Sequence, residues 1–384
     1  MTNYPIYLDY NATTPCDPLV VEAMLPFFGI HFGNAASKTH SYGWLAEESV
    51  EIARENVANL INATPNEIVF TSGATESINL AIRGIVEPYN VKETHIITFA
   101  TEHKAVLDVY YYLQTKGIST TILPVQSDGL PNLKELENAI TPNTKLISMM
   151  YANNETGVIM PVEQVANIAQ KHNIPFFCDA TQAVGKIPVD VIDKKIDLMC
   201  FSAHKMYGPK GCGALNIRKK TPKLNIQPFL YGGGHERKMR SGTLNVPGIV
   251  GFGKACEISK FQLQDESKRI LSLRNLLLNH LLEDNNIILN GNLNQLLPNV
   301  ANILFINPSG TEIIKWLSKH VAISSGSACT SASIEPSHVL IAMGLSENMA
   351  ANAIRFSLGR YTTEEQIVQA VKYIKEGLSI SIKI

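Results

Sequence analysis

The segment Asp197-Leu198-Met199-Cys200-Phe201-Ser202-Ala203-His204-Lys205-Met206-Tyr207-Gly208-Pro209 joins a short apolar run to a lysine and a Gly-Pro turn. The run Asp197–Ser202 is predicted to form a strand buried on both faces, because near-continuous apolar residues suit strands that helices cover on each side. Lys205 then follows the end of that strand directly. Loss of water there would lower the pKa of its amine and favour Schiff-base formation, whereas most lysines are solvated surface groups.

Six further apolar runs flank this strand along the chain, and helical patterns lie between them. Ser77–Val86 places Ile78, Ile82 and Ile85 on one helical face, and Val162–Lys171 is a second such pattern. Strand–helix alternation predicts an α/β domain built on a mainly parallel, seven-stranded sheet flanked by helices. The six runs are Glu67–Thr71, His95–Phe99, Thr120–Pro124, Lys145–Tyr151, Ile174–Cys178 and Cys212–Ile217.

The pattern changes after about residue 260. Gln262–Glu283 reads as a long amphipathic helix, Val300–Ile306 as a strand and Glu364–Leu378 as a further helix. This part of the chain is predicted to be a second, smaller α+β domain. Asn285–Thr311 is long enough to span a bilayer and has no charged residue, but its eight asparagines make insertion too costly, so loop and strand are expected and no membrane segment.

Charge and cysteine content exclude several classes of protein. Lys and Arg total 33 against 34 Asp and Glu, a formal charge of −1, which argues against a chain that coats nucleic acid or an anionic membrane. No Cys-x-x-Cys pair occurs, so neither a zinc ribbon nor a thioredoxin-like site is indicated. Free thiols, no intrinsic metal, no signal peptide and a cytoplasmic location are expected. The cysteines are Cys16, Cys178, Cys200, Cys212, Cys256 and Cys329.

Two further motifs lie at predicted strand ends. Thr71–Glu76 follows one strand and opens a helix, where exposed N–H groups and the helix dipole favour a phosphate. Asp179 follows another strand, at the edge where open α/β sheets bind their ligands, and its carboxylate could hold a protonated heterocycle nitrogen. For both motifs the alternative is an ordinary helix N-cap.

The conjunction of these motifs with Lys205 points to a pyridoxal phosphate site. This cofactor needs a Schiff-base lysine, an acid on its ring nitrogen and an anion hole. Along the chain, the anion hole is supplied by Thr71–Glu76, the acid by Asp179 and the amine by Lys205. Ser202 and His204 flank the lysine as phosphate donors.

Two more side chains are candidates for chemistry. His103 follows the predicted strand His95–Phe99, where an imidazole could stack on the cofactor or move a proton, although a lone histidine is more often structural. Cys329 lies within Ser324–Ser333, among small residues that suit a mobile, exposed loop. That setting suits a nucleophile or sulfur carrier, and the alternative is an incidental loop thiol. Cys178, Cys200 and Cys212 lie in strand-like runs and are predicted to be core residues.

Taken together, these motifs resemble the cysteine desulfurases of the housekeeping iron–sulfur-cluster type, within the class V aminotransferases and the fold-type-I pyridoxal phosphate enzymes. The resemblance implies a large cofactor-binding domain over residues 15–260 and a small domain of residues 1–14 plus 261–384 that carries the cysteine loop. The matching blocks are Tyr7–Pro15, Phe70–Ser77, Thr101–Val106, Asn153–Gly157, Asp179–Gln182, Ser202–Gly213, Gly232–Leu244, Ser324–Ala332 and Arg355–Arg360.

The resemblance assigns cofactor contacts to individual residues. Lys205 would form the Schiff base, Asp179 would pair with the pyridine nitrogen, and Gln182 would bond the phenolic oxygen. His103 would stack over the ring and act in catalysis. Thr243 would reach the phosphate of the other subunit, which implies a homodimer with shared sites. The remaining cofactor contacts would be Ala74, Thr75, Asn154, Ser202 and His204.

The implied activity is conversion of L-cysteine to L-alanine through a persulfide on Cys329. Asn154 and Arg355 would contact the substrate, Arg355 by a bidentate grip on its carboxylate. An iron–sulfur scaffold protein and other sulfur acceptors are the implied partners, and Cys329 could be a transient cluster ligand in a scaffold complex. Longer members dock the scaffold with a C-terminal extension. This sequence stops at Ile384, which leaves scaffold docking open.

Three alternatives stay open at this point. An aminotransferase on the same fold would not need Cys329 and would release a keto acid. A selenocysteine lyase would turn over little cysteine. A non-catalytic sulfur-relay protein that kept the fold would lack the yellow colour of the bound cofactor, although Asp179, Lys205 and His103 argue against it.

Overall fold

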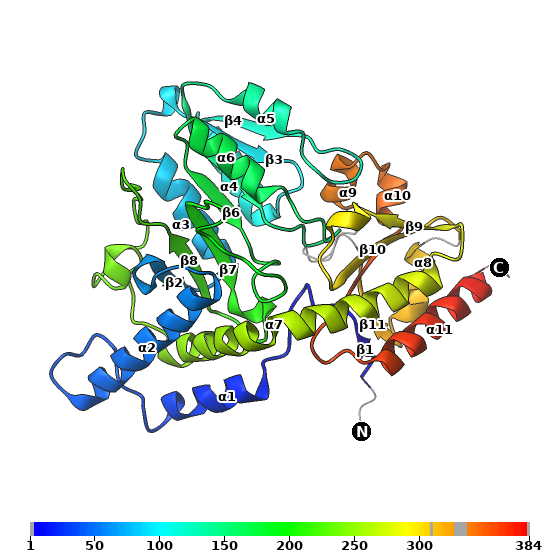
Figure 1. Ribbon diagram of the computed structural model, residues 1–384, viewed down its shortest axis with the longest axis horizontal. Helices are drawn as coiled ribbons and strands as arrows, with labels where there is room; N and C mark the ends of the chain where they lie inside the picture. The colour runs from blue at the N-terminus through cyan, green and yellow to red at the C-terminus, as the bar shows by residue number, and fades with distance from the viewer. Residues whose placement is uncertain (1–3, 308–309, 326–335, 382–384) are drawn as a thin grey trace.

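The computed structural model describes residues 4–307, 310–325 and 336–381. Its main sheet has seven strands in the order β2-β8-β7-β6-β5-β3-β4, and β8 is the one strand of this sheet that runs opposite to the other six (Figure 1). The predicted mainly parallel seven-stranded sheet is therefore confirmed. The strands are β2 Ile68–Thr71, β3 His95–Phe99, β4 Ser119–Leu123, β5 Thr144–Met150, β6 Phe176–Asp179, β7 Leu198–Ser202 and β8 Gly213–Ile217.

Helices cover both faces of this sheet, as the continuous apolar runs predict. In β6, Phe176 and Cys178 belong to one core cluster and Phe177 belongs to another. Helices α3 and α4 pack on the second cluster, whereas α2, α6 and the first half of α7 pack on the first. The bounds are α2 Ser41–Leu60, α3 Ala74–Val86, α4 Lys104–Thr115, α5 Leu133–Ala139, α6 Val162–Lys171 and α7 Val246–Leu281.

The rest of the chain forms two smaller sheets with helices beside them, in agreement with the predicted α+β character. One sheet is antiparallel, in the order β12-β13-β10-β9, and β1 pairs with β11 in the other. The asparagine-rich segment contributes β9 and β10, and no helix in the described part of the chain could cross a membrane. The strands are β1 Ile6–Tyr7, β9 Ile287–Asn290, β10 Val300–Phe305, β11 Val321–Ala322, β12 Ser324–Ser325 and β13 Ala353–Ser357. The helices are α1 Pro18–Met24, α8 Gly310–Leu317, α9 His338–Ala342, α10 Glu347–Ala351 and α11 Glu364–Ser381.

The predicted start of the long helix at Gln262 is wrong. Helix α7 has 36 residues and begins at Val246, where the side chain of Asn245 caps the N–H of Gly248 at 3.2 Å. The glycines in this first part of the helix have low helix propensity, so sequence analysis does not predict a helix there. Close tertiary contacts explain them: a Cβ on Gly253 would lie 2.5 Å from the Cα of Ala53 in α2, and a Cβ on Gly251 would lie 2.5 Å from the sulfur of Met24 in α1.

Helix α7 belongs to two hydrophobic cores. Residues up to Cys256 pack in the core of the main sheet, and residues from Ile270 pack in a core with β10, β13, α8 and α11. Leu8 joins the second core as well. The predicted division into residues 15–260 and residues 1–14 plus 261–384 stays a prediction, and its boundary lies within α7 between the two cores.

Candidate active site

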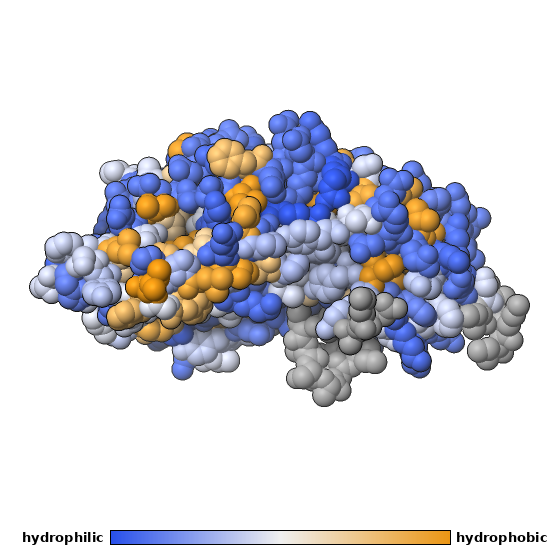
Figure 2. Space-filling view, turned by 90° about the horizontal axis from the view of Figure 1, so that it is seen from below, coloured by the Kyte–Doolittle hydropathy of each residue, from blue (hydrophilic) through white to orange (hydrophobic). Residues whose placement is uncertain are grey.

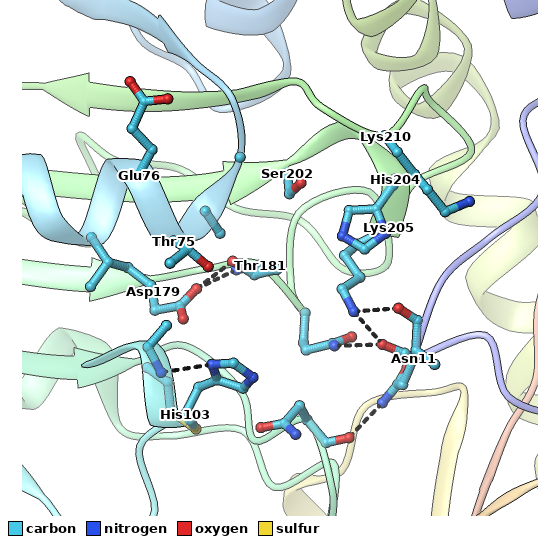
Figure 3. Close-up of a pocket in the computed structure, with 18 of the residues that line it drawn as sticks. Asn11, Thr75, Glu76, His103, Asp179, Thr181, Ser202, His204, Lys205 and Lys210 are labelled. Carbon is cyan, nitrogen blue, oxygen red and sulfur yellow. Dashed lines mark hydrogen bonds between the residues drawn. The ribbon is translucent and has the colours of Figure 1, made fainter. Parts of the chain in front are cut away.

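One cavity of about 560 Å³ opens where strands β6 and β7 end and helix α3 begins (Figure 3). Carboxyl ends of parallel strands are where open α/β sheets bind ligands. Of the predicted site residues, Thr243 does not line this cavity and is exposed, and Cys329 lies outside the described residues. The cavity brings together all the others: Ala74, Thr75, His103, Asn154, Asp179, Gln182, Ser202, His204, Lys205 and Arg355.

The start of α3 forms one wall of the cavity. Gly73 precedes the helix with a φ of +156°, and a Cβ on Gly213 of β8 would lie only 2.6 Å from the Cα of Gly73. The two glycines therefore let the turn pack against the sheet edge. The first N–H groups of a helix have no partner within the helix and favour an anion, so this wall suits a phosphate.

His204 faces the same cavity as a neutral ring. Burial, followed by the nearby charges of Lys205, Lys210 and Lys186, lowers the pKa of His204 to about 4. Its Nδ1 lies 3.1 Å from Oγ1 of Thr13. At neutral pH this histidine can therefore hydrogen-bond an anion but adds no positive charge.

The sequence analysis gave no role to Glu76, which lines this wall, or to Arg240, which pairs with it. The Glu76 carboxylate accepts the N–H of Ser72 at 2.7 Å and pairs with Arg240 at 2.7 Å. The position of Glu76 in the first turn of α3 was the available signal. Arg240 belongs to the same segment as Thr243, so this ion pair fixes that segment to the anion-binding turn.

Asp179 presents one carboxylate oxygen to the cavity. Its Oδ1 accepts the N–H of Thr181 at 3.0 Å, the hydroxyl of Thr181 and the thiol of Cys200 at 3.6 Å. These three donors fix the carboxylate, which is buried, and leave Oδ2 for a group in the cavity. Such a carboxylate fits a protonated ring nitrogen. Asp179 also makes a cap-like contact, as the alternative of an N-cap predicts, because its Oδ1 accepts the backbone N–H of Thr181.

His103 lines the cavity and also has a structural role in the fold. It is the N-cap of α4, where its Nδ1 accepts the N–H of Ala105 at 3.1 Å. Burial lowers the pKa of His103, and the negative charge of Asp179 opposes that effect. In the neutral ring the proton is therefore on Nε2. His103 is accordingly arranged to stack or to donate a hydrogen bond rather than to take up a proton.

Lys205 and Gln182 meet at one residue that the sequence analysis gave no role. The Lys205 Nζ donates to the backbone oxygens of Asn11 at 2.6 Å and Ala12 at 2.7 Å. Gln182 donates its amide to the same Asn11 oxygen at 3.1 Å, and the Asn11 amide donates to the Asn154 carbonyl at 3.0 Å (Figure 3). Asn11 lies in the quoted block Tyr7–Pro15, which was the available signal.

Arg355 reaches the cavity from β13. Its guanidinium donates to Asp9 Oδ1 at 2.7 Å and to the Asn154 carbonyl at 3.1 Å. Its Nε is buried and has no partner among the described residues. A buried donor without a partner costs free energy, so this guanidinium has spare capacity for an anionic ligand.

Taken together, the lining fits pyridoxal phosphate. Lys205 supplies the amine, Asp179 Oδ2 an acceptor for the ring nitrogen, Gln182 an amide donor and the start of α3 an anion site. The unpartnered Nε of Arg355 fits the carboxylate of an amino acid. Among the described ranges, no group of three or more histidine, cysteine, aspartate or glutamate side chains could hold a metal ion.

The five described cysteines are all free thiols. Cys178, Cys200 and Cys212 are buried, as predicted for core residues, and burial raises the pKa of each thiol. Cys256 is buried in α7, and the pKa of the half-buried Cys16 is also raised by burial. Thiolate formation is therefore disfavoured at each of these five positions.

Glu102 is a buried acid beside the site. Its Oε1 accepts the N–H of Met150 at 2.7 Å, and its Oε2 is buried without a partner among the described residues. Burial, followed by the charge of Asp179, raises the pKa of Glu102 from 4.5 to about 8. The folded chain therefore keeps this proton at pH values where the unfolded chain has lost it, so Glu102 costs stability increasingly as pH rises from 4.5 towards 8.

Replacing Glu102 by glutamine is expected to stabilise the protein at alkaline pH, because the amide mimics the protonated acid. The gain in the free energy of unfolding over wild type should be larger at about pH 9 than at about pH 5, by on the order of a few kcal/mol. Denaturant unfolding at both pH values measures it, with the exposed Glu93→Gln as the matched control. An equal effect of Glu102→Gln at the two pH values would contradict the buried titration.

The fold and this lysine-centred cavity define a class of protein, and the chain belongs to it: the aminotransferase class-V family, whose model matches residues 6–370. A relative named Cysteine desulfurase IscS, from Anaeromyxobacter sp. (strain Fw109-5), is 51% identical over 373 residues, which are 97% of this chain and 92% of that protein.

Solved structures agree with this family. A NifS-like protein is 40% identical, with a TM-score of 0.91 and coverage of 98% of this chain and 100% of that chain. A structure titled SspA in complex with cysteine is 37% identical, with a TM-score of 0.82 and coverage of 93% of this chain and 100% of that chain.

Proposed function

We propose that the chain is a pyridoxal-phosphate-dependent cysteine desulfurase, which converts L-cysteine to L-alanine and passes the sulfur to acceptors. The observation that carries the proposal is the convergence of Lys205, Asp179 and the start of α3 on one cavity. Relatives about half identical to the chain are named cysteine desulfurase, and a similar structure is titled as a complex with cysteine, which supports the choice of substrate.

The roles of the cavity residues follow from their contacts. When bound, pyridoxal phosphate supplies the chemistry that joins the substrate amine and withdraws electrons from its Cα. Asp179 Oδ2 would keep the ring nitrogen protonated, and the start of α3, with Ser202 and His204, would hold the phosphate. Arg355, which lines the cavity, would bind the substrate carboxylate through its guanidinium.

Lys205 is the better candidate for moving the proton of the substrate Cα. His103, which the sequence analysis considered for moving a proton, is the other candidate. The N-cap contact keeps the His103 Nδ1 occupied by a backbone N–H, and the neutral ring then has its proton on Nε2. His103 would therefore stack on the ring or donate a hydrogen bond, and the amine of Lys205 would carry the proton.

Cys329 is proposed as the residue that takes the sulfur, on its sequence context alone, since it lies outside the described residues. Its thiolate would attack the sulfur of L-cysteine, so that an S–S bond forms as the C–S bond breaks. The electron pair of the C–S bond stays with the substrate, which is protonated and leaves as L-alanine. The persulfide on Cys329 then passes its sulfur to an acceptor, of which an iron–sulfur scaffold protein is one.

The proposal includes a homodimer. Helices α1 and α2 and the segment between them expose many apolar side chains, and Figure 2 shows apolar surface over this part of the molecule. Exposed apolar patches of this kind mark interfaces. Thr243 is exposed, does not line the cavity of its own chain, and could reach that of a second copy. The exposed apolar residues include Leu19, Leu25, Phe28, Ile30, Phe32, Trp44 and Ile52.

Product analysis tests the proposed function. Purified protein loaded with pyridoxal phosphate is incubated with an external thiol and either L-cysteine or L-selenocysteine, and alanine, sulfide or selenide, and keto acids are measured together. Alanine and sulfide in equal amounts are expected. A keto acid in place of alanine would indicate an aminotransferase. Turnover of selenocysteine but not of cysteine would indicate a selenocysteine lyase. Failure to hold the yellow cofactor would indicate a non-catalytic protein.

A further inference from the structure

Lys186 lies behind the cavity, and the proposed reaction gives it no role. Its Nζ donates to Oδ1 of Asn11 at 3.1 Å and to Oε1 of Gln182, four residues earlier in the chain. The residue is half-buried, but its amine end meets two side chains that are almost fully buried. A lysine amine placed this way acts inside the molecule and not in solvent.

The contact decides which way the Gln182 amide faces. A side-chain amide can turn over, and its two orientations exchange a donor for an acceptor. With Oε1 towards Lys186, the Nε2 group donates to the Asn11 carbonyl at 3.1 Å and has a second hydrogen for the cavity that Gln182 lines. In the opposite orientation, two donors would face each other at Lys186 and an acceptor would face the Asn11 carbonyl.

Asn11 keeps the lysine in place. Its Oδ1 accepts from Lys186 and also from the amide of Asn299 at 2.9 Å, and its own amide is held by the Asn154 carbonyl. Asn11 is 1% exposed, so these bonds do not compete with water. The lysine thus has two fixed amide oxygens as acceptors, and both belong to residues that line the cavity.

We infer that Lys186 is a positioning residue, which holds Gln182 with its amide nitrogen towards the cavity as a hydrogen-bond donor to the phenolic oxygen of bound cofactor. This inference rests on the proposed function for the identity of the cofactor. A methyl thioether in place of the amine would leave both amide orientations of Gln182 available, and the cavity would lose a fixed donor.

The charges around Lys186 agree with a role as a donor. Burial, followed by the charges of Lys205 and Arg355, lowers the pKa of Lys186 well below its usual value. A neutral amine still has two N–H groups, which match the two amide oxygens. The other titratable groups that face this position are Tyr10, Tyr207 and Glu266, across a small neighbouring cavity, and His204 on the cofactor side.

The pH titration of the visible absorbance of the holoenzyme tests the inference without use of turnover. A hydrogen bond to the phenolic oxygen stabilises the deprotonated form of the cofactor more than the protonated form. Loss of the donor is therefore expected to raise the pH midpoint of the titration. Lys186→Met is expected to shift the midpoint upward by about one pH unit. Lys186→Arg, which keeps the N–H donors, should return it towards wild type, and the exposed Lys195→Met should not move it.

A double-mutant cycle separates positioning from other effects. If Lys186 acts through Gln182, Lys186→Met should cause no further shift in a Gln182→Ala holoenzyme. An unchanged midpoint in Lys186→Met, or the same upward shift in the Gln182→Ala background, would overturn the inference. A wild-type holoenzyme that titrates normally but releases no sulfide from L-cysteine would overturn the proposed function and leave this comparison of midpoints valid.

Discussion

Lys205→Ala is expected to lower turnover of L-cysteine by about a thousandfold or more, because it removes both the covalent attachment of the cofactor and the proposed carrier of the Cα proton. The amine of Lys205 lines the cavity, where it donates to the carbonyls of Asn11 and Ala12. Sulfide and alanine release under saturating cysteine measures the loss.

The attachment itself provides the control. Borohydride reduction of the wild-type holoenzyme should leave the cofactor bound covalently to the peptide that contains Lys205, and mass spectrometry should find no such adduct in Lys205→Ala. Lys210→Ala removes a second lysine of the cavity lining and should keep the adduct on Lys205. Covalent cofactor on another lysine of the wild-type chain would contradict the assignment.

Cys329→Ser is expected to lower the rate of sulfur transfer by about a thousandfold or more, since a serine hydroxyl is a far poorer nucleophile than a thiolate. The visible absorbance of the cofactor should be kept. Rapid acid quench of the wild type after addition of L-cysteine should give a chain heavier by one sulfur atom. The serine variant should show the spectral change of substrate binding without that added mass.

Cys16→Ser is the matched control for this substitution. Cys16 is the half-buried thiol among the described cysteines, and burial raises its pKa, so it is a poor thiolate and its loss should leave turnover unchanged. Full transfer of sulfur to a protein acceptor by Cys329→Ser would exclude the assigned role. Persulfide found on Cys16 in the wild type would exclude it as well.

The main sheet could be predicted because its strands, apart from the edge strand β4, are buried on both faces and so read as continuous apolar runs. The start of α7 could not, because its glycines are explained only by tertiary contacts: Gly253 lies against Ala53 of α2, and Gly251 lies against Met24 of α1. Propensity argues against glycine in a helix unless packing compensates.

The candidate site divides in the same way. Asp179, Lys205 and the start of α3 stand at strand ends that the sequence reveals, so they could be predicted from local pattern. Asn11 could not be assigned a role that way, because its bonds to Gln182 and Lys205 join positions 171 and 194 residues apart. Burial of the Glu102 carboxylate is likewise a property of the packed state and has no local signature.

The contact between Asp9 and Arg355 spans 346 positions and has a consequence for biosynthesis. At roughly 10 residues per second, the ribosome adds Arg355 about half a minute after Asp9. During that interval the nascent chain can present the strand ends of the main sheet but has no guanidinium to complete the pocket. Capture of the substrate carboxylate is therefore expected only after β13 has emerged and paired, which keeps a half-made chain from starting sulfur chemistry.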